Sequence, residues 1–107
     1  MVADDVLAVA NTQLGYREST RNYIVEDDGI TTKGYTRYGA WYGYTYGDWC
    51  AMFCSFCLNY AGVDRNLMPF EAGCQRWVEK LEGLGLYHAA GSYDPKPGDL
   101  IFFDWDE

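Results

Sequence analysis

Apolar side chains recur at helical spacing in the first stretch of the chain, residues 4–14. Two aspartates open this stretch, where negative charge suits the positive end of a helix dipole, and Gly15 follows as a suitable stop. The pattern therefore predicts an amphipathic helix over 4–14. Its apolar stripe consists of Val6, Leu7, Ala10 and Leu14.

Two further stretches predict helices. Residues 48–61 carry almost no charge and repeat apolar residues at helical spacing, so this helix is expected to be central and buried nearly all round. Asp48 is a suitable N-cap for it, and Gly62 is a suitable stop. A third helix is predicted over 71–82, ended by Gly83. One face of this helix consists of Cys74, Trp77, Val78 and Leu81.

The segment between the first two predicted helices, residues 16–47, is polar, glycine-rich and aromatic. Glu26–Gly29 has the composition of a turn. We expect this segment to form an ordered loop with little regular structure.

A short apolar run, Leu100–Phe103, follows the turn Asp94–Asp99 and predicts a strand. A single strand cannot satisfy its own backbone donors and acceptors, so it needs partners. Tyr23–Val25 is one candidate partner and Leu86–His88 is a poorer one. We therefore expect the remaining strands of the sheet to lie beyond Glu107 or in a second copy of the chain, which would imply self-association.

The composition predicts one globular domain, 1–107, because 49% of the residues are apolar and 22% are charged. No apolar run approaches the roughly 18 residues of a membrane helix. Sixteen acidic and eight basic residues give a net charge of −8, which repels phosphate backbones and anionic lipids. We expect neither nucleic acid nor a membrane surface as a partner, whereas neutral and cationic ligands stay open.

Aromatic residues make up 18% of the chain, and many of them lie between Tyr35 and Trp49. Tyr and Trp rings commonly line grooves that hold sugars or peptides. The same glycine-punctuated segment would also suit a roof over a small core. The pattern leaves both interpretations open.

Cys50 falls in the first turn of the helix predicted over 48–61. Unpaired backbone N–H groups and the helix dipole favour a thiolate at this position, which would make Cys50 a nucleophile. The same N–H groups would serve as an oxyanion hole for acyl transfer. The alternative is a buried structural cysteine.

Cys50, Cys54 and Cys57 also share the C-x₃-C-x₂-C spacing of the iron–sulfur site of radical S-adenosylmethionine enzymes. Those enzymes place the motif on a loop of a much larger barrel, whereas here it falls on a predicted helix. A zinc site would need Cys74 or His88 as its fourth ligand. We interpret Cys54 and Cys57 as core residues and expect no metal or cofactor, with a metal or iron–sulfur site as the alternative.

His88 is the one histidine of the chain. A cysteine nucleophile normally needs a histidine base that is held by a polar third group. His88 is therefore a candidate base by residue type, although its loop-like stretch equally suits an ordinary surface histidine.

Three segments resemble the CHAP domain, a cysteine, histidine-dependent amidohydrolase/peptidase of the NlpC/P60 kind. They are Tyr38–Gly43, Asp48–Cys57 and Pro95–Phe103. The resemblance runs from about Asp5 to the end of the chain. It implies a papain-like α+β fold, in which N-terminal helices and a central Cys-bearing helix pack on an antiparallel sheet. Only the first core strand of that sheet would be present here.

The resemblance implies that Cys50 is the nucleophile of a bacterial or phage peptidoglycan hydrolase. Such an enzyme cuts an amide bond in the stem peptide or between peptide and sugar. Relatives often carry a Tyr near the oxyanion site, for which Tyr38 or Tyr42 would correspond. The candidate oxyanion site and substrate groove consist of Tyr38, Trp41, Tyr42, Asp48 and Trp49. The alternative function is a non-catalytic glycan- or peptide-binding module that uses the aromatic segment 35–49.

CHAP domains carry their histidine after the strand that matches Leu100–Phe103, whereas His88 precedes that strand. We therefore expect residues 1–107 to represent part of a CHAP-like domain and to be hydrolytically inactive as isolated monomers. Wall hydrolases act outside the cytoplasm, so the expected location is extracellular or the cell wall. The start of the chain, Met1–Asp5, lacks the features of a signal peptide, which we attribute to a chain boundary or a phage-type export route.

Overall fold

The computed structural model describes residues 2–89 and 91–102. Helices and one small antiparallel sheet make up this part of the chain, which confirms the α+β class. In chain order the elements are α1 (Val2–Thr12), β1 (Tyr23–Val25), β2 (Thr32–Gly34), α2 (Arg37–Tyr42), α3 (Cys50–Tyr60) and α4 (Cys74–Gly83).

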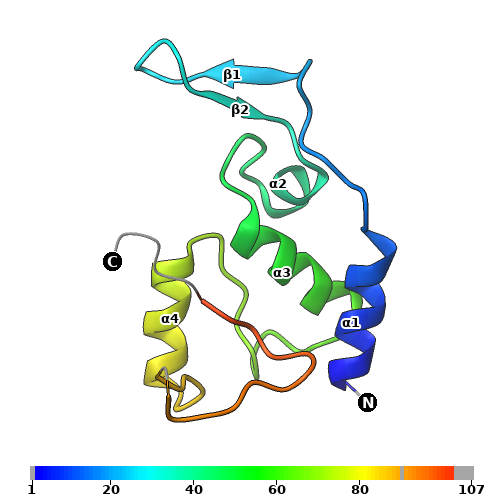
Figure 1. Ribbon diagram of the computed structural model, residues 1–107, viewed down its shortest axis with the longest axis vertical. Coiled ribbons are helices and arrows are strands. Elements are labelled where there is room, and N and C mark those ends of the chain that lie inside the picture. Colours follow the sequence, from blue (N-terminus) through cyan, green and yellow to red (C-terminus); the bar gives the residue numbers. More distant parts are fainter. Residues whose placement is uncertain (1, 90, 103–107) are drawn as a thin grey trace.

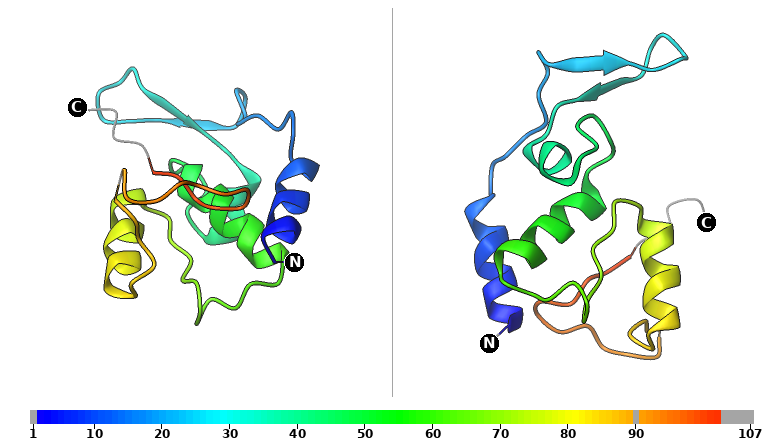
Figure 2. Two further views of the ribbon diagram at one scale, coloured as in Figure 1. Left: turned by 60° about the horizontal axis from the view of Figure 1, so that its bottom comes forward. Right: turned by 180° about the vertical axis from the view of Figure 1, so that it is seen from behind.

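Helix α3 is the centre of the arrangement. Both α1 and α2 contact it, and α4 stands on the side of α3 opposite to α1 (Figures 1 and 2). The β1–β2 hairpin projects from the α2 end of the molecule, away from α1 and α4. The segment after α4, orange to red in Figure 1, runs back below α3 in that view.

The three predicted helices are confirmed, with bounds that differ by up to three residues. Asp48 is not the N-cap that the sequence suggested. Trp49 occupies the cap position of α3 without a side-chain cap hydrogen bond, because the Asp48 carboxylate pairs with Lys33 of β2 instead. Gly83 is also not a stop: it is the last residue of α4, and the left-handed turn falls on Gly85, at φ 73°.

The expectation of little regular structure over 16–47 is wrong in part. The turn at Glu26–Gly29 is confirmed, but it joins two antiparallel strands in which Tyr23 faces Gly34 and Val25 faces Thr32. Helix α2 follows, and the hydroxyl of its N-cap Thr36 accepts a hydrogen bond from the Gly39 N–H at 3.0 Å. Strands of three residues and a helix of six are too short to leave a hydrophobic period in the sequence.

The predicted strand at Leu100–Phe103 does not form over Leu100–Phe102, and Phe103 lies outside the described residues. Tyr23–Val25 is a strand, as suggested, but it pairs with β2, and Leu86–His88 forms no strand. Leu100 and Phe102 pack against the core, whereas Ile101 between them is 57% exposed. The Phe102 ring meets the Trp77 ring edge-on at 5.9 Å.

The core lies between α1, α3 and α4 and includes the segment that leads into α4. Trp77 is its largest buried side chain, with 1% of its surface exposed, and its indole N–H donates to the Pro69 carbonyl at 2.9 Å. The buried members are Val6, Ala51, Cys57, Leu58, Phe70, Trp77 and Leu81.

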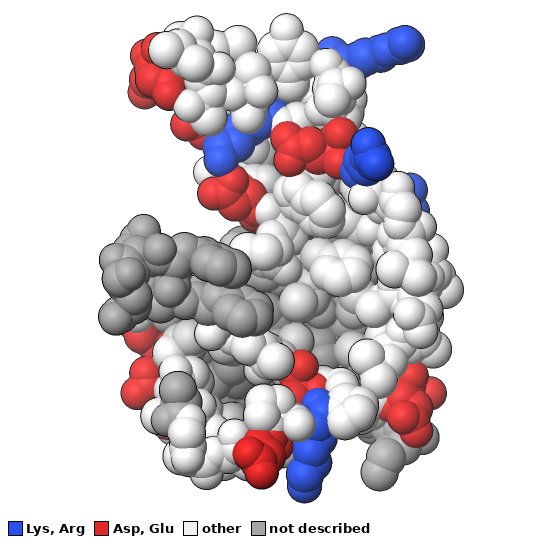
Figure 3. All heavy atoms as spheres, in the orientation of Figure 1, with Lys and Arg blue, Asp and Glu red and all other residues white. Residues whose placement is uncertain are grey.

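Charged side chains on the face shown in Figure 3 lie mainly towards its two ends, with a largely uncharged band between them. None of the helices in the described ranges combines the length and apolar character that a bilayer crossing demands.

Candidate functional site around Cys50

Cys50 is the first residue of α3, and its side chain is exposed. The sequence predicted this position. Trp49 gives no side-chain cap, so the first N–H groups of α3 lack that partner. Of the first three residues, Cys50 is exposed, whereas Ala51 and Met52 are buried. The first recorded backbone bond at this end joins the Phe53 N–H to the Trp49 carbonyl at 2.7 Å. The thiol therefore lies beside the positive end of the helix dipole.

The other two cysteines of α3 differ from Cys50 in burial. Cys57 is buried and Cys54 is half-buried. Burial raises the pKa of both thiols to about 11, and nearby Cys57 and Cys50 contribute further to the raised pKa of Cys54. Both thiols therefore keep their protons at neutral pH, as expected of core cysteines.

Cys74 is the neighbour of Cys50 that sequence reasoning missed. It is the first residue of α4, its side chain is exposed, and its Sγ lies 3.3 Å from the Sγ of Cys50. Burial, and then the hydrogen bond with Cys50, raise the pKa of Cys74 to about 11. Cys74 therefore keeps its proton at neutral pH, and either sulfur atom can be the donor in the contact with Cys50.

Ser55 explains why α4 begins next to α3. Its side chain is fully buried, and its hydroxyl donates to the Glu71 carbonyl at 2.9 Å while accepting from the Glu71 N–H at 3.0 Å. This two-way bond fixes the backbone three residues before Cys74. The Glu71 carboxylate in turn binds Lys80 of α4 at 2.7 Å and the Ala72 N–H at 3.0 Å, which lowers its pKa, with the Lys80 hydrogen bond as the main cause.

Asp48 forms an ion pair with the β1–β2 hairpin. Its exposed carboxylate pairs with the Lys33 ammonium, and this hydrogen bond is the main cause of the raised pKa of Lys33. Glu26 lies 3.9 Å from the same ammonium. The contact ties β2 to the residue that leads into α3.

Tyr38 lies in the core and not in an open groove. Its ring is fully buried and stacks on Trp49, with centroids 5.4 Å apart and planes 20° apart. Its hydroxyl donates to the Gln13 side-chain oxygen at 2.9 Å. The Trp49 indole N–H donates to Glu18 at 3.0 Å, so both polar tips are already partnered.

Trp41 and Tyr42 are half-buried at the C-terminal half of α2. Trp41 meets the Phe56 ring edge-on at 5.8 Å and lies 6.2 Å from the Phe70 ring. Of the two interpretations of the aromatic segment, these contacts favour the roof over a core. Tyr44, at 63% exposed, is the ring of this segment that is most open to solvent.

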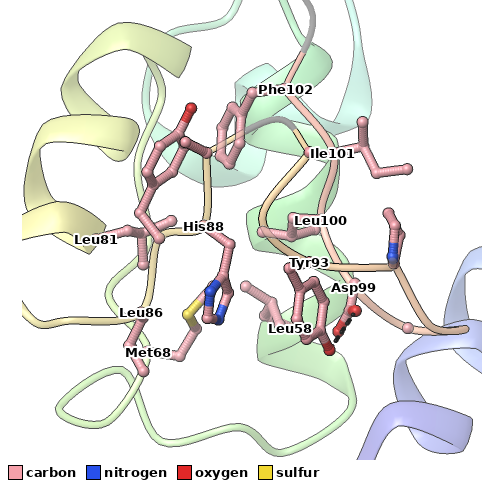
Figure 4. Close-up of a pocket in the computed structure, with 15 residues that line it drawn as sticks. Leu58, Met68, Leu81, Leu86, His88, Tyr93, Asp99, Leu100, Ile101 and Phe102 are labelled. Carbon is pink, nitrogen blue, oxygen red and sulfur yellow. Dashed lines mark hydrogen bonds between the residues drawn. The ribbon is translucent and has the colours of Figure 1, made fainter.

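His88 lies in a different part of the molecule. It lines a cavity of about 550 Å³ between α4 and the segment after it, with its ring stacked on Tyr93 at 4.4 Å (Figure 4). The Tyr93 hydroxyl donates to Asp99 at 3.1 Å. Cys50 does not line this cavity, and no hydrogen bond joins it to His88 in the described ranges. The structure therefore does not bring these two residues together.

The metal alternative required further ligands around the α3 cysteines. Across residues 2–89 and 91–102, no three His, Cys, Asp or Glu side chains gather as a set that could hold a metal ion.

Sequence reasoning thus located Cys50, considered Cys74 only as a zinc ligand, and did not predict the contact of Cys74 with Cys50 or the role of Ser55. A cysteine directly after Gly73, at the start of a predicted helix, was the available signal for Cys74. Nothing in the sequence signals that the starts of two helices meet. Comparison of the chain with protein-family models, curated proteins and solved structures found no match.

Proposed function

We propose that Cys50 is the nucleophile of a cysteine amidase or peptidase that acts on peptidoglycan outside the cytoplasm. The observation that supports it is the contrast along α3: Cys50 is exposed at the first residue, whereas Cys54 and Cys57 are shielded and have pKa values of about 11. One thiol of the helix is thus accessible to a substrate. The substrate class comes from the resemblance to CHAP domains.

The chemistry expected of Cys50 is attack on an amide carbonyl. The Cys50 sulfur forms a bond to the carbonyl carbon, and the carbonyl oxygen gains negative charge. The N–H of the exposed Cys50 is the candidate donor to that oxygen, since Ala51 and Met52 are buried. Collapse of this intermediate expels the amine, which must gain a proton, and leaves a thioester on Cys50. Water then hydrolyses the thioester.

The proton for the leaving amine needs a donor close to Cys50. His88 is stacked on Tyr93 in the cavity beside α4, so we do not assign it as the base. In the proposed papain-like arrangement a helix that begins with the nucleophile is central, and α3 has this character. In CHAP domains, which the chain resembles, the histidine base follows the strand that matches Leu100–Phe103.

An acylation assay tests the nucleophile without requiring a complete active site. The reduced chain is mixed at pH 7.5 with a stem-peptide aryl ester, whose leaving group needs no protonation, and analysed by intact mass and peptide mapping. We expect one acyl group on Cys50, lost in Cys50→Ser and kept in Cys54→Ser. Acylation spread evenly over several cysteines, or none in the native chain, would contradict the proposal.

The binding-module alternative is tested in the same samples. Peptidoglycan fragments that bind equally to native chain and Cys50→Ser, but not to Trp41→Ala, would favour it if acylation is absent.

A further inference from the structure

Two cysteines from different helices meet at one point of the surface. Cys50 begins α3 and Cys74 begins α4, and Figure 1 shows the starts of these helices side by side. The two Sγ atoms are 3.3 Å apart, and both side chains are exposed. A small thiol or disulfide reagent can therefore reach either sulfur.

We propose that Cys50 and Cys74 form a reversible disulfide that opens and closes with the thiol–disulfide balance of the surroundings. A disulfide bond is about 2.05 Å long, so from 3.3 Å the sulfurs must approach by about 1.2 Å. Rotation of two exposed side chains and a small shift of the first turn of α4 can supply this approach. The backbone before Cys74 stays fixed by Ser55.

The pairing is selective among the cysteines of α3. Cys57 is buried and Cys54 is half-buried, whereas Cys74 is exposed like Cys50, so a small disulfide reaches the Cys50–Cys74 pair more readily than the other two thiols. Cys50 and Cys54 lie one turn apart on the same helix, where the geometry for a disulfide is poor. Cys74 is thus the favoured partner of Cys50.

The reaction needs an oxidant, for which a small disulfide such as oxidised glutathione suffices. The Cys50 sulfur attacks one sulfur of the small disulfide and forms a mixed disulfide, and the small thiol that is released takes up the Cys50 proton. The Cys74 sulfur then attacks the Cys50 sulfur of the mixed disulfide. The second small thiolate leaves and takes the Cys74 proton, so two protein thiols are oxidised and one small disulfide is reduced to two thiols.

The consequence for activity rests on the proposed function of Cys50. In the disulfide the Cys50 sulfur is not a thiolate and cannot attack a carbonyl, so the oxidised chain would be inactive. A reductant would restore the activity. The disulfide would act as a switch on the same sulfur that performs the acylation.

The test uses the whole chain in glutathione buffers of graded oxidation. Closure removes two hydrogens, so the intact mass should fall by about 2 Da. Trypsin without reductant should then yield fragment 38–65 linked to fragment 66–76. The link should be present in the native chain and in Cys54→Ser, absent in Cys50→Ser and Cys74→Ser, and removed by dithiothreitol. Because both substituted sulfurs are exposed, the serine variants should keep the native circular dichroism spectrum.

Stable attachment of glutathione to Cys50 without a link, or a link that persists in Cys50→Ser, would overturn the inference. Failure of the proposed function gives a different result: the link forms and reverses, yet the reduced chain is not acylated by the aryl ester. If both hold, the linked chain should lose all acylation at Cys50 and recover it on reduction.

Discussion

Ser55→Ala should destabilise the fold far more than its small size suggests. The hydroxyl makes two hydrogen bonds with the Glu71 backbone, and both residues are buried. Each lost bond costs about 1 kcal/mol, and an N–H and a carbonyl that stay buried without partners add about 1 kcal/mol or more. Alanine regains about 0.5 kcal/mol of helix propensity, so the net loss should be about 2–3 kcal/mol.

Urea unfolding followed by circular dichroism measures this loss. With a slope of about 1.5 kcal/mol/M, the midpoint should fall by about 1.3–2 M. The matched control is Asn59→Ala, an exposed position of the same helix, which should change the free energy of unfolding by less than about 0.5 kcal/mol. A loss below about 0.5 kcal/mol for Ser55→Ala, at unchanged slope, would refute the role given to this bond.

Three further substitutions test the packing around the site. Glu71→Gln should lower the free energy of unfolding by about 1 kcal/mol at pH 7, and by no more, because Lys80 is half-exposed and water screens its ion pair with Glu71. Folding lowers the pKa of Glu71, so the loss should be present above about pH 4.5 and vanish as the pH falls through the native pKa. Gly39→Ala places a Cβ 2.6 and 2.7 Å from two carbonyl oxygens and should cost about 2 kcal/mol, whereas Gly83→Ala meets open space. Trp77→Phe should cost about 2 kcal/mol through a lost hydrogen bond and a cavity.

Each of these expectations has a contrary result in the same unfolding assay. If Glu71→Gln lowers the free energy of unfolding equally at pH 3 and pH 7, the carboxylate charge is not the cause of the loss. Equal effects of Gly39→Ala and Gly83→Ala would mean that the close approach after α2 does not constrain residue 39. A Trp77→Phe variant as stable as the native chain would show that the indole N–H contributes little.

The helices were predictable because apolar side chains recur at helical spacing, although in the first predicted stripe Val6 is buried and Leu7 and Leu14 are exposed. The stripe of 4–14 and the face of 71–82 that carries Trp77 and Leu81 both lead to helices close to the predicted bounds. The hairpin was not predictable as a pair, because its strands have three residues each, β1 is exposed throughout, and only the turn at Glu26–Gly29 has a local signal. The prediction that Asp48 is the N-cap of α3 was wrong for a similar reason: the Asp48 carboxylate pairs with Lys33, which is distant in sequence.

In the candidate site, too, local features were predictable and tertiary contacts were not. The place of Cys50 at the start of a helix was predicted from local information, whereas its exposure was not, because this helix was expected to be buried nearly all round. Its contact with Cys74 depends on how the segment after α3 returns, and that path is fixed by Ser55 and Glu71, whose bond no pattern announces. His88 was proposed from residue type alone, and tertiary packing places it against Tyr93 instead.

The hairpin also bears on how the protein behaves at high concentration. Within the described residues β1 pairs only with β2, and Ile24 and Val25 on it are 45% and 53% exposed. A free strand edge with apolar side chains invites extended backbone from other molecules. The acidic turn at Glu26–Asp28 and the short strands oppose such stacking. Neutralising that turn with amides should therefore lower solubility before it changes the folded core.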